Sequence, residues 1–392
     1  MRKLKDVDLR GKRVLMRVDF NIPMDKEGGI IADAKMKAAF PSIEYVMSHG
    51  GRLILMSHLG RPQGRPDESY SLKKIACRLE ELLRQKVKMA SDSVGEEVAS
   101  MVENLQPGEV MMLENLRFHG EEEKNDPEYA RRLASLGDVY INDAFGTAHR
   151  AHASTSGVAD YIPAYAGFLM ENEVSMLKKV LDYPENPRMA ILGGAKITDK
   201  IGLIANLVKK LDIILIGGGM ANTFLLAQGY GVGCSLCEQD LVGQAASILQ
   251  QAGNSGTKLL LPIDALVTAE IKRDAGFNTV AADAVGDDMI IADIGPQTID
   301  LFCREISKAR TIVWNGPMGI YEYEQFARGT KSIAQAIADS SSISVIGGGD
   351  SAAAVQDMGL EKSITHISTG GGATLEFLEG IRLPGVAACE AG

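Results

Sequence analysis

Residues 213–219 read Ile-Ile-Leu-Ile-Gly-Gly-Gly, an apolar run that passes directly into three glycines. Similar runs end in glycines at 190–194, 344–349 and 368–372. Such a run predicts a buried strand, and its glycines predict a turn in which the backbone approaches another group closely. In open α/β sheets, ligands bind beyond the carboxyl ends of the strands, where helix N-termini favour phosphate. The four runs together predict a nucleotide or phosphate site.

Strand-like runs alternate with amphipathic helical stretches along nearly the whole chain. Strands are expected at 13–18, 52–57, 110–114, 139–143, around 191, and at 213–216, 258–262, 311–314 and 343–346. Helical patterns lie at 72–83, 126–136, 201–211, 241–251 and 329–339. Repeated strand–helix units predict parallel sheets covered on both faces, and 392 residues suffice for two domains. We therefore predict an α/β protein with two doubly wound domains.

A helical pattern at 171–181 is bracketed by Pro163 upstream and by Pro184 and Pro187 downstream. Proline fixes its own backbone and interrupts helices, so the segment predicts a helix set between two breaks. We expect it to connect the two domains as a stiff strut.

Composition and charge exclude several classes of protein. The formal net charge of −10 argues against general binding to nucleic acid or to an anionic membrane. We find no signal peptide and no run approaching the roughly 18 apolar residues of a membrane span. Five cysteines, an odd number, predict reduced thiols and a cytoplasmic protein. Cys234 and Cys237 form a C-x-x-C, but no second pair lies nearby to complete a zinc site.

Polar and basic residues follow each predicted strand of the first half. Asp19 and Asn21 follow the first strand, and Ser57-His58-Leu59-Gly60-Arg61 follows the second. Arg117 and Arg150 come after the next two. Because the ends of parallel strands converge on one edge, these side chains predict a site for a small phosphate or carboxylate ligand. Any one of them alone is also compatible with a solvated or ion-paired surface residue.

The second half places charged residues beside its glycine runs. Lys196 and Lys200 are four residues apart, so on a helix they share a face that can meet a polyphosphate; two solvated lysines are the alternative. Glu322 lies within reach of a ribose after Trp314–Gly319. Asp350 is a candidate Mg²⁺ ligand, or an ordinary helix N-cap.

Two familiar nucleotide motifs are excluded or weak. The chain contains no G-x-x-x-x-G-K-[ST], so it has no Walker-type loop. Residues 347–352 match G-x-G-x-x-A, but no acidic residue ends a following strand about 20 residues on.

Ten segments in order carry a family resemblance. They read RVDFNIP, SHLGRP, ENLRF, NDAFGTAHRAH, GGAKITDK, GGGMANTF, DIGPQT, WNGPMG, GGGDS and STGGGATLEFLEG. On these segments the chain resembles phosphoglycerate kinase from about Leu9 to Pro384. The resemblance implies two Rossmann-like domains joined by a hinge helix. It implies a phosphoglycerate-binding domain at 1–168 that takes back a C-terminal tail at about 376–392. The hinge helix is then 169–182 and the nucleotide-binding domain 183–375.

The resemblance also implies roles for individual residues. The expected substrate-binding residues are Asp19, Phe20, Asn21, Lys35, His58, Leu59, Gly60, Arg61, Arg117 and Arg150. The expected nucleotide-binding residues are Lys196, Lys200, Gly217, Gly218, Gly219, Gly295, Asn315, Pro317, Met318, Glu322, Gly348, Gly349, Asp350 and Ser351. Lys35, Lys196, Gly348 and Gly349 are the expected catalytic residues, and Asp350 the Mg²⁺ ligand.

Two positions depart from the family pattern. Lys35 stands where the family usually has an arginine, which keeps the charge but loses the bidentate fork; Lys37 is the alternative bearer of that charge. Ser351 stands where threonine is usual and keeps the hydroxyl.

The activity implied is reversible transfer of the acyl phosphate of 1,3-bisphosphoglycerate to MgADP, giving 3-phosphoglycerate and MgATP. A hinge-bending step and a cytoplasmic monomer acting on these small molecules, without nucleic acid or membrane, are expected with it. A non-catalytic nucleotide-binding module and an NAD-dependent dehydrogenase are the alternatives. The first would lack the basic residues or Lys196, and the second would need a dinucleotide fingerprint near a first strand.

Overall fold

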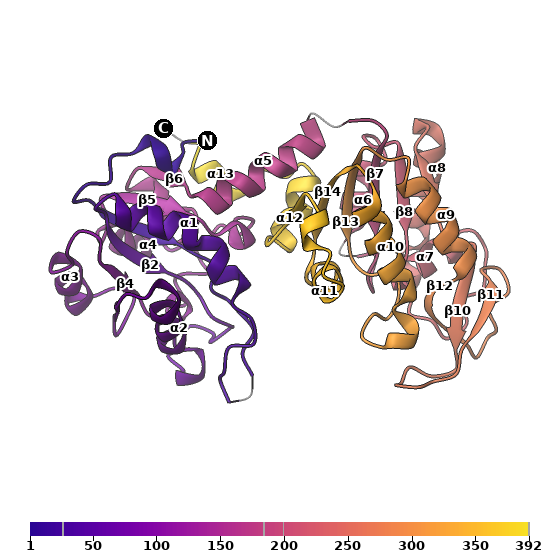
Figure 1. The fold of residues 1–392 in the computed structure, drawn as a ribbon, viewed down its shortest axis with the longest axis horizontal. Coiled ribbons are helices and arrows are strands. Elements are labelled where there is room, and N and C mark those ends of the chain that lie inside the picture. Colours follow the sequence, from indigo (N-terminus) through magenta and orange to yellow (C-terminus); the bar gives the residue numbers. More distant parts are fainter. Residues whose placement is uncertain (26, 183–184, 199, 391–392) are drawn as a thin grey trace. The chain divides into compact units, whose positions relative to one another are not determined.

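The structure is a computed structural model that describes residues 1–392 except 26, 183–184, 199 and 391–392. Contacts within the chain divide it into two compact units (Figure 1). The first unit comprises Met1–Ser175 and Arg382–Gly392, and the second comprises Met176–Ile381. The domain limits predicted from the sequence, with a hinge at 169–182, stay a prediction, because compactness alone does not show which segment bends.

The first unit is built on a six-stranded sheet in the order β3-β4-β2-β1-β5-β6. Every pairing in it is parallel. Strand order reverses between β1 and β5, which therefore form the switch point of the sheet. The strands are β1 (Arg13–Arg17), β2 (Arg52–Met56), β3 (Val87–Met89), β4 (Val110–Met112), β5 (Val139–Asn142) and β6 (Ala164–Ala166).

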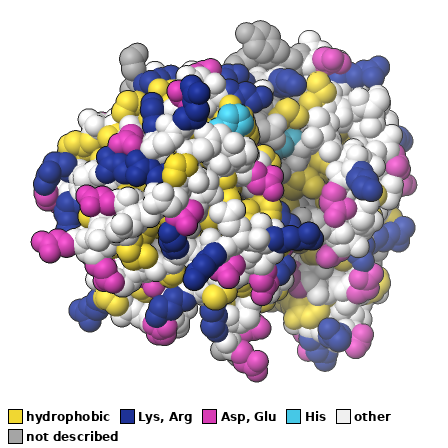
Figure 2. All heavy atoms as spheres, turned by 60° about the vertical axis from the view of Figure 1, so that its left-hand side comes forward, with side chains coloured by type: hydrophobic (Ala, Val, Ile, Leu, Met, Phe, Trp, Pro, Cys, Tyr) yellow, Lys and Arg dark blue, Asp and Glu magenta, His cyan; other side chains and the backbone are white. Residues whose placement is uncertain are grey.

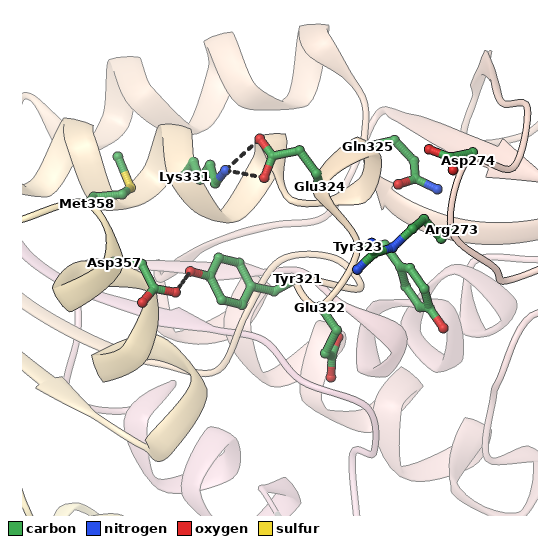
Figure 3. A pocket seen from close by; sticks show the side chains of 10 residues that line it. All are labelled: Arg273, Asp274, Tyr321, Glu322, Tyr323, Glu324, Gln325, Lys331, Asp357 and Met358. Carbon is green, nitrogen blue, oxygen red and sulfur yellow. Dashed lines mark hydrogen bonds and ion pairs between the residues drawn. The ribbon is translucent and has the colours of Figure 1, made fainter. Parts of the chain in front are cut away.

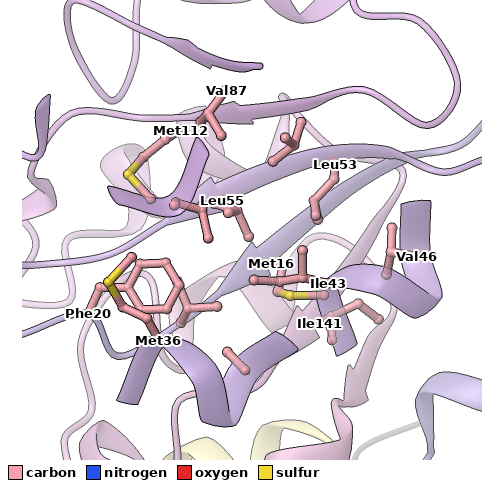
Figure 4. Close-up of a cluster of buried hydrophobic side chains, with 14 of the residues drawn as sticks. Met16, Phe20, Met36, Ile43, Val46, Leu53, Leu55, Val87, Met112 and Ile141 are labelled. Carbon is pink, nitrogen blue, oxygen red and sulfur yellow. The ribbon is translucent and has the colours of Figure 1, made fainter. Parts of the chain in front are cut away.

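Both faces of this sheet are buried. Along β1, Val14 and Met16 belong to one apolar cluster, and Leu15 between them belongs to another. Figure 4 shows Met16 with Met36 and Ile43 in the first of these clusters. Because side chains alternate along a strand, one apolar run supplies two cores. The helices of this unit are α1 (Ala34–Ser48), α2 (Lys73–Leu83), α3 (Glu96–Glu103), α4 (Pro127–Ala134) and α13 (Pro384–Ala388).

The second unit also contains a six-stranded parallel sheet, in the order β15-β14-β13-β7-β8-β9. Its order reverses between β7 and β13. The strands are β7 (Arg188–Leu192), β8 (Ile213–Ile216), β9 (Lys258–Leu260), β13 (Thr311–Asn315), β14 (Ile343–Gly347) and β15 (His366–Ile367). The only tryptophan in the sequence, Trp314, is fully buried in the core of this unit. The predicted α/β class with two doubly wound parallel sheets is confirmed.

The helices of the second unit include α9 and α10, which pack side by side (Figure 1). Its helices are α6 (Ile201–Leu207), α7 (Gly219–Ala227), α8 (Val242–Ser255), α9 (Pro296–Ile306), α10 (Arg328–Asp339), α11 (Gly349–Asp357) and α12 (Gly372–Leu378). No helix in the described part of the chain combines the length and apolar character that crossing a bilayer requires.

Several strands were not expected from the sequence. The strands β3, β6 and β15 have only two or three residues and lack the longer apolar run that predicted the equally short β4 and β9. A separate antiparallel sheet, β11-β10-β12, is formed by β10 (Asp264–Thr268), β11 (Asn278–Ala281) and β12 (Ile290–Ile294). Most residues of β11 are exposed, so this strand has no apolar run to reveal it.

The predicted helix at 171–181 is α5 (Phe168–Asp182). Its N-terminus is held by the buried carboxylate of Asp143, whose Oδ1 accepts hydrogen bonds from Leu169 N at 2.9 Å and Met170 N at 3.2 Å. These bonds satisfy two of the amides that a helix start leaves unpaired. Burial raises the pKa of Asp143 to about 6, and the hydrogen bonds that it accepts offset burial only partly.

The raised pKa predicts how stability changes with pH. The folded protein holds a proton on Asp143 between about pH 4 and pH 6, where the unfolded chain has lost it. The proton on Asp143 therefore stabilises the folded protein fully below pH 4, and this stabilisation is lost as pH rises through 6. The free energy of unfolding falls by about 3 kcal/mol over this range. Asp143→Asn removes the titration, so its stability relative to the wild type is expected to increase as pH rises. Calorimetry between pH 4.5 and 7.5 measures this, with the exposed Asp240→Asn as control; parallel pH curves for Asp143→Asn and the wild type would contradict it.

Candidate functional site

The polar residues predicted in the first half lie beyond the carboxyl ends of four parallel strands of one sheet. Asp19 and Asn21 follow β1, and His58 follows β2. Arg117 follows β4, and Arg150 follows β5. The sequence prediction that these residues gather at one edge of a sheet agrees with this topology. The basic members, His58, Arg61, Arg117 and Arg150, are called the basic cluster below.

Gly60 joins two of these side chains through its backbone. Its N–H donates to Asn21 Oδ1 at 2.9 Å, and its carbonyl accepts from Arg117 Nη1 at 2.8 Å. Gly60 has a φ of +61°, and a Cβ there would collide with the ring of Tyr70. The position therefore requires glycine.

Lys35, on α1, reaches the same edge of the sheet. Its Nζ donates to Asp19 Oδ2 at 2.9 Å and to the Asn21 carbonyl at 3.3 Å. Lys37 instead pairs with Asp33 at 2.8 Å. Of the two lysines that could replace the family's arginine, Lys35 is the one in contact with the predicted substrate residues. Phe20 and Leu59 have buried side chains, so they can offer only backbone groups to a ligand.

The electrostatics of the basic cluster make His58 neutral. Burial, followed by the charges of Arg17, Arg117, Arg150 and Lys35, holds the pKa of His58 well below its usual range. Burial and the neighbouring arginines also lower the pKa of His152, to about 4. The positive charge of the cluster therefore comes from its arginines. Arg61 is exposed, and Arg150 Nε donates to His149 Nε2 at 3.2 Å.

Arg17, the last residue of β1, is a member of this site that the sequence analysis missed. Its side chain is 1% exposed, and its Nη2 lies 3.1 Å from His58 Nδ1. An arginine within the apolar run Val14–Val18 was a signal, because a buried guanidinium needs several acceptors.

In the second unit the glycine turns follow β7, β8, β13 and β14, and backbone hydrogen bonds link the first three of them. Gly193 N donates to the Asn315 carbonyl at 2.9 Å, and Gly194 N donates to the Pro317 carbonyl at 2.9 Å. Gly218 N donates to the Met318 carbonyl at 3.0 Å. These bonds connect the ends of β7, β8 and β13 at the switch point of the sheet, where ligands of doubly wound folds bind.

A cavity of about 490 Å³ opens beside these turns. Six of the predicted nucleotide-binding residues line it: Gly218, Gly219, Pro317, Met318, Glu322 and Asp350. Its apolar wall includes Leu236, Ile271, Ile290 and Ile291, none of which was predicted. Gly217 and Gly295 are not among the lining residues. The combination of apolar walls and glycine turns fits a nucleobase and ribose better than a fully charged lining does.

A larger cavity of about 780 Å³ also has Glu322 in its lining (Figure 3). Its lining is mainly charged. Four of its side chains form two pairs, one an ion pair and the other a hydrogen bond. Lys331 contacts both carboxylate oxygens of Glu324 at 2.7 Å, and Tyr321 donates to Asp357 at 2.5 Å. It lacks a glycine turn among its lining residues, so we place the candidate nucleotide site in the smaller cavity.

The two predicted lysines differ in their surroundings. Lys196 is exposed and makes no hydrogen bond or ion pair with any residue that the structure describes. Lys200 is 8% exposed, and its Nζ donates to the carbonyls of Asn315, at 3.1 Å, and Gly193. The expectation that both lie on one helix face is wrong, because α6 begins only at Ile201. Lys200 links two turns, and its contact with a phosphate stays a prediction.

The loop that carries Lys196 is held by Glu238, a second residue that the sequence analysis missed. Glu238 Oε2 accepts hydrogen bonds from Ile197 N at 2.6 Å and Thr198 N at 3.0 Å. Hydrogen bonds from Thr198 are the main cause that lowers the pKa of Glu238. The carboxylate therefore anchors the backbone directly after Lys196.

The turn after β14 leads into α11. Its N-cap is Gly348, with a φ of +93°, so the alternative that Asp350 is the N-cap is wrong. Asp350 lies exposed in the first turn of α11. The Ser351 hydroxyl is buried and accepts a hydrogen bond from Gly316 N at 2.6 Å. Ser351 thus ties the turn after β13 to α11.

The residues around Asp350 fit a magnesium ion that arrives with its ligand. Within the described residues, no group of three or more His, Cys, Asp or Glu side chains could hold a metal on its own. Mg²⁺ is commonly held by one or two carboxylates, with phosphate oxygens and water completing its shell. One exposed carboxylate beside the glycine turns matches that donor set.

Comparison with known proteins identifies the family. The family model described as phosphoglycerate kinase matches residues 4–381. The chain belongs to the phosphoglycerate kinase family. Phosphoglycerate kinases from Moorella thermoacetica and Prosthecochloris aestuarii are 55% identical over 385 residues and 56% over 389 residues. Each alignment covers 98% of both chains.

Solved structures agree with the sequence relatives. The phosphoglycerate kinase from Coxiella burnetii superimposes with a TM-score of 0.90 at 40% identity, covering 99% of this chain and 98% of that one. The phosphoglycerate kinase from Pyrococcus horikoshii gives 0.87 at 36% identity, covering 100% and 98%. The predicted resemblance to phosphoglycerate kinase is confirmed. The chain is an enzyme, a kinase, and neither a dehydrogenase nor a non-catalytic binding module is favoured.

The glycine turns predict a large effect of one added methyl group. Gly218 has a φ of +66°, and a Cβ there would lie 2.6 Å from Gly194 N and 2.9 Å from the Pro317 carbonyl. Gly218→Ala is expected to destabilise the second unit by about 3 kcal/mol or more, since backbone atoms must move. Gly229→Ala, with a φ of +87° and nothing within 4 Å, is expected to cost only about 1 kcal/mol. Urea denaturation followed by Trp314 fluorescence measures both; equal losses would show that close packing at Gly218 is unimportant.

Proposed function

We propose that this enzyme transfers the acyl phosphate of 1,3-bisphosphoglycerate to MgADP, giving 3-phosphoglycerate and MgATP, and that it catalyses the reverse reaction. The observation that carries this proposal is the family match, which runs through both units from residue 4 to residue 381. The geometry supports it, because each unit has a polar site at the switch point of its own parallel sheet.

The basic cluster and its neighbours are the proposed binding site for the phosphoglycerate. Arg117 and Arg150 would bind phosphate and carboxylate oxygens, since a guanidinium forms two parallel hydrogen bonds with such groups. Asn21 and Asp19 would contact the hydroxyl and carboxylate region. Lys35 is proposed to contact the acyl phosphate of 1,3-bisphosphoglycerate.

The glycine-turn cavity is the proposed nucleotide site. The amides of Gly348 and Gly349, at the N-terminus of α11, would face phosphate oxygens. Lys196 would contact the transferred phosphoryl group, and Glu322 the ribose hydroxyls. Asp350 would hold Mg²⁺, which when bound neutralises charge on the nucleotide phosphates.

The chemistry that we propose needs positioning and charge neutralisation. The bond between phosphorus and the acyl oxygen breaks, and a bond from phosphorus to a β-phosphate oxygen of ADP forms. The carboxylate that leaves is stable at neutral pH, so no general base is required. Lys35, Lys196 and the amides of Gly348 and Gly349 would stabilise the charge on the phosphoryl oxygens.

Three further properties are proposed with this function. Because the two substrates are assigned to different units, a step must bring them together, and we propose residues 169–182 as the hinge of that step. The protein is proposed to act as a cytoplasmic monomer, without nucleic acid or membrane. The net charge of −10 supports the absence of polyanionic partners. On the face drawn in Figure 2, basic and acidic side chains are interspersed.

The proposal predicts Mg²⁺-dependent turnover that requires Lys196. The assay supplies 3-phosphoglycerate and MgATP and follows 1,3-bisphosphoglycerate through its coupled reduction by NADH. Lys196→Ala is expected to lower kcat about 100-fold, because a charge that stabilises the transferred group is lost. Lys209→Ala, at an exposed position of the same unit, serves as the control and should retain activity. A folded wild-type protein that binds MgADP without turnover would refute the proposed function.

A second prediction distinguishes Lys35 from Lys37. Lys35→Ala is expected to lower kcat about tenfold or more, since a charge on the acyl phosphate is lost. Lys35→Arg should retain at least the wild-type kcat, because the guanidinium keeps the charge and adds a second donor. Lys37→Ala is the matched control on the same helix. If Lys37→Ala has the larger effect and Lys35→Ala almost none, the charge must be reassigned to Lys37.

A further inference from the structure

Arg17 is a buried cation whose hydrogen bonds go to three different groups. Its Nε donates to Ser154 Oγ at 2.9 Å, its Nη1 donates to the Val18 carbonyl, and its Nη2 lies 3.1 Å from His58 Nδ1. A buried charge is costly unless it is paired and hydrogen-bonded. None of these three partners carries a negative charge, so the balancing charge must come from further away.

That charge is supplied by Glu122, whose side chain is fully buried. Its Oε1 accepts a hydrogen bond from Ser154 Oγ at 2.5 Å, and its Oε2 accepts one from Ser154 N at 3.0 Å. Burial raises the pKa of Glu122, and the charge of Arg17 and the bonds from Ser154 oppose that rise. The Ser154 hydroxyl therefore donates to Glu122 while it accepts from Arg17, and links the two charges.

The contact with Arg17 determines which nitrogen of His58 carries the proton. A guanidinium can only donate hydrogen bonds, so His58 Nδ1 must be the acceptor. Nδ1 is then unprotonated, and the proton of the neutral ring is on Nε2. Nε2 makes no hydrogen bond with any residue in the described part of the chain. Four cations near the ring, Arg17, Arg117, Arg150 and Lys35, disfavour a second proton.

We propose that Glu122 is a positioning residue of the phosphoglycerate site. Through Ser154 it holds Arg17, and Arg17 holds His58 as the neutral ring protonated on Nε2. His58 then offers the substrate one fixed N–H donor and no positive charge. The proposal rests on the proposed function, because it assumes that the basic cluster binds the phosphoglycerate. Arg17 and Glu122 act through His58, and neither is assigned a contact with the reacting atoms.

The first experiment measures which ring nitrogen of His58 is protonated in the substrate-free enzyme. Nitrogen-15 NMR of the histidine side chains distinguishes a protonated from an unprotonated ring nitrogen, and His58→Gln assigns the signal by its loss. We expect an unprotonated Nδ1 and a protonated Nε2 that stay unchanged from pH 5.5 to pH 8. A ring protonated on Nδ1, or on both nitrogens, at pH 7 would overturn the proposal. This readout does not depend on activity, so it separates the proposal from the proposed function.

The second experiment breaks the link between Glu122 and Arg17. Ser154→Ala removes only the bridging hydroxyl, and Glu122→Gln removes only the charge. Both are expected to change the nitrogen-15 signals of His58 and to raise KM for 3-phosphoglycerate about tenfold, with KM for MgATP unchanged. A purely structural defect would lower thermal stability and activity without this selective rise in KM. Glu121→Gln, an exposed neighbour of Glu122, is the matched control and should leave both readouts unchanged.

The results for Ser154→Ala and Glu122→Gln are interpreted together. If Glu122→Gln fails to fold, Ser154→Ala decides, since it leaves both charges in place. Unchanged His58 signals and an unchanged KM in Ser154→Ala would overturn the proposal. If the His58 signals change as expected but the wild type does not turn over 3-phosphoglycerate, the proposed function fails and the positioning of His58 by Glu122 stands.

Discussion

The hydrogen bond from Gly193 N to the Asn315 carbonyl joins the ends of β7 and β13, the two strands between which the order of the second sheet reverses. Around this bond, the turns after β7, β8 and β13, from distant parts of the sequence, pack backbone against backbone. A side chain at Gly218 would occupy the space of the Gly194 amide. Lys200 and Ser351 add hydrogen bonds to the same turns. The cavity beside them depends on this close approach, because Gly194, Gly218 and Gly219 are part of its lining.

In the first unit, positively charged side chains gather at the carboxyl end of a buried sheet. Most of its cations have an anionic or polar partner: Lys35 contacts Asp19, Arg117 lies 3.2 Å from Glu123, and Arg17 is linked to Glu122 through Ser154. Such pairing keeps the guanidinium groups in place when no ligand is bound. Because His58 is neutral, it adds no further cation beside the buried Arg17 and Arg117. Under the proposed function, the second unit would offer its phosphate-bearing ligand main-chain amides, and the first unit would offer its ligand side chains that are already paired.

The features that the sequence predicted are those with a strong local signal. Strands that lie in a continuous apolar run were recognised, including the three-residue β4 and β9, and the glycines and basic residues that follow them lie at the strand ends. The buried five-residue strand β10 was missed. The short strands β3, β6 and β15, and the exposed β11, carry no such signal. Ile290 and Ile291 were missed as cavity residues because they belong to β12 in the unexpected antiparallel sheet. The burial of Lys200 and the pairing of Arg17 depend on partners about 115 and 137 residues away, which periodicity does not reveal.

The return of residues 382–390 to the first unit has a consequence for biosynthesis. In that unit Gly385 N donates to the Ala148 carbonyl at 2.8 Å, and Arg2 N donates to the Cys389 carbonyl at 2.8 Å. These residues leave the ribosome only after the whole of Met176–Ile381 has been made. The first unit therefore emerges early but waits for its last helix, while the second unit can acquire all of its own contacts first. During that interval the parts of β6 and of residues 145–147 that α13 later contacts are open to solvent, and a chaperone or a neighbouring nascent chain can reach them.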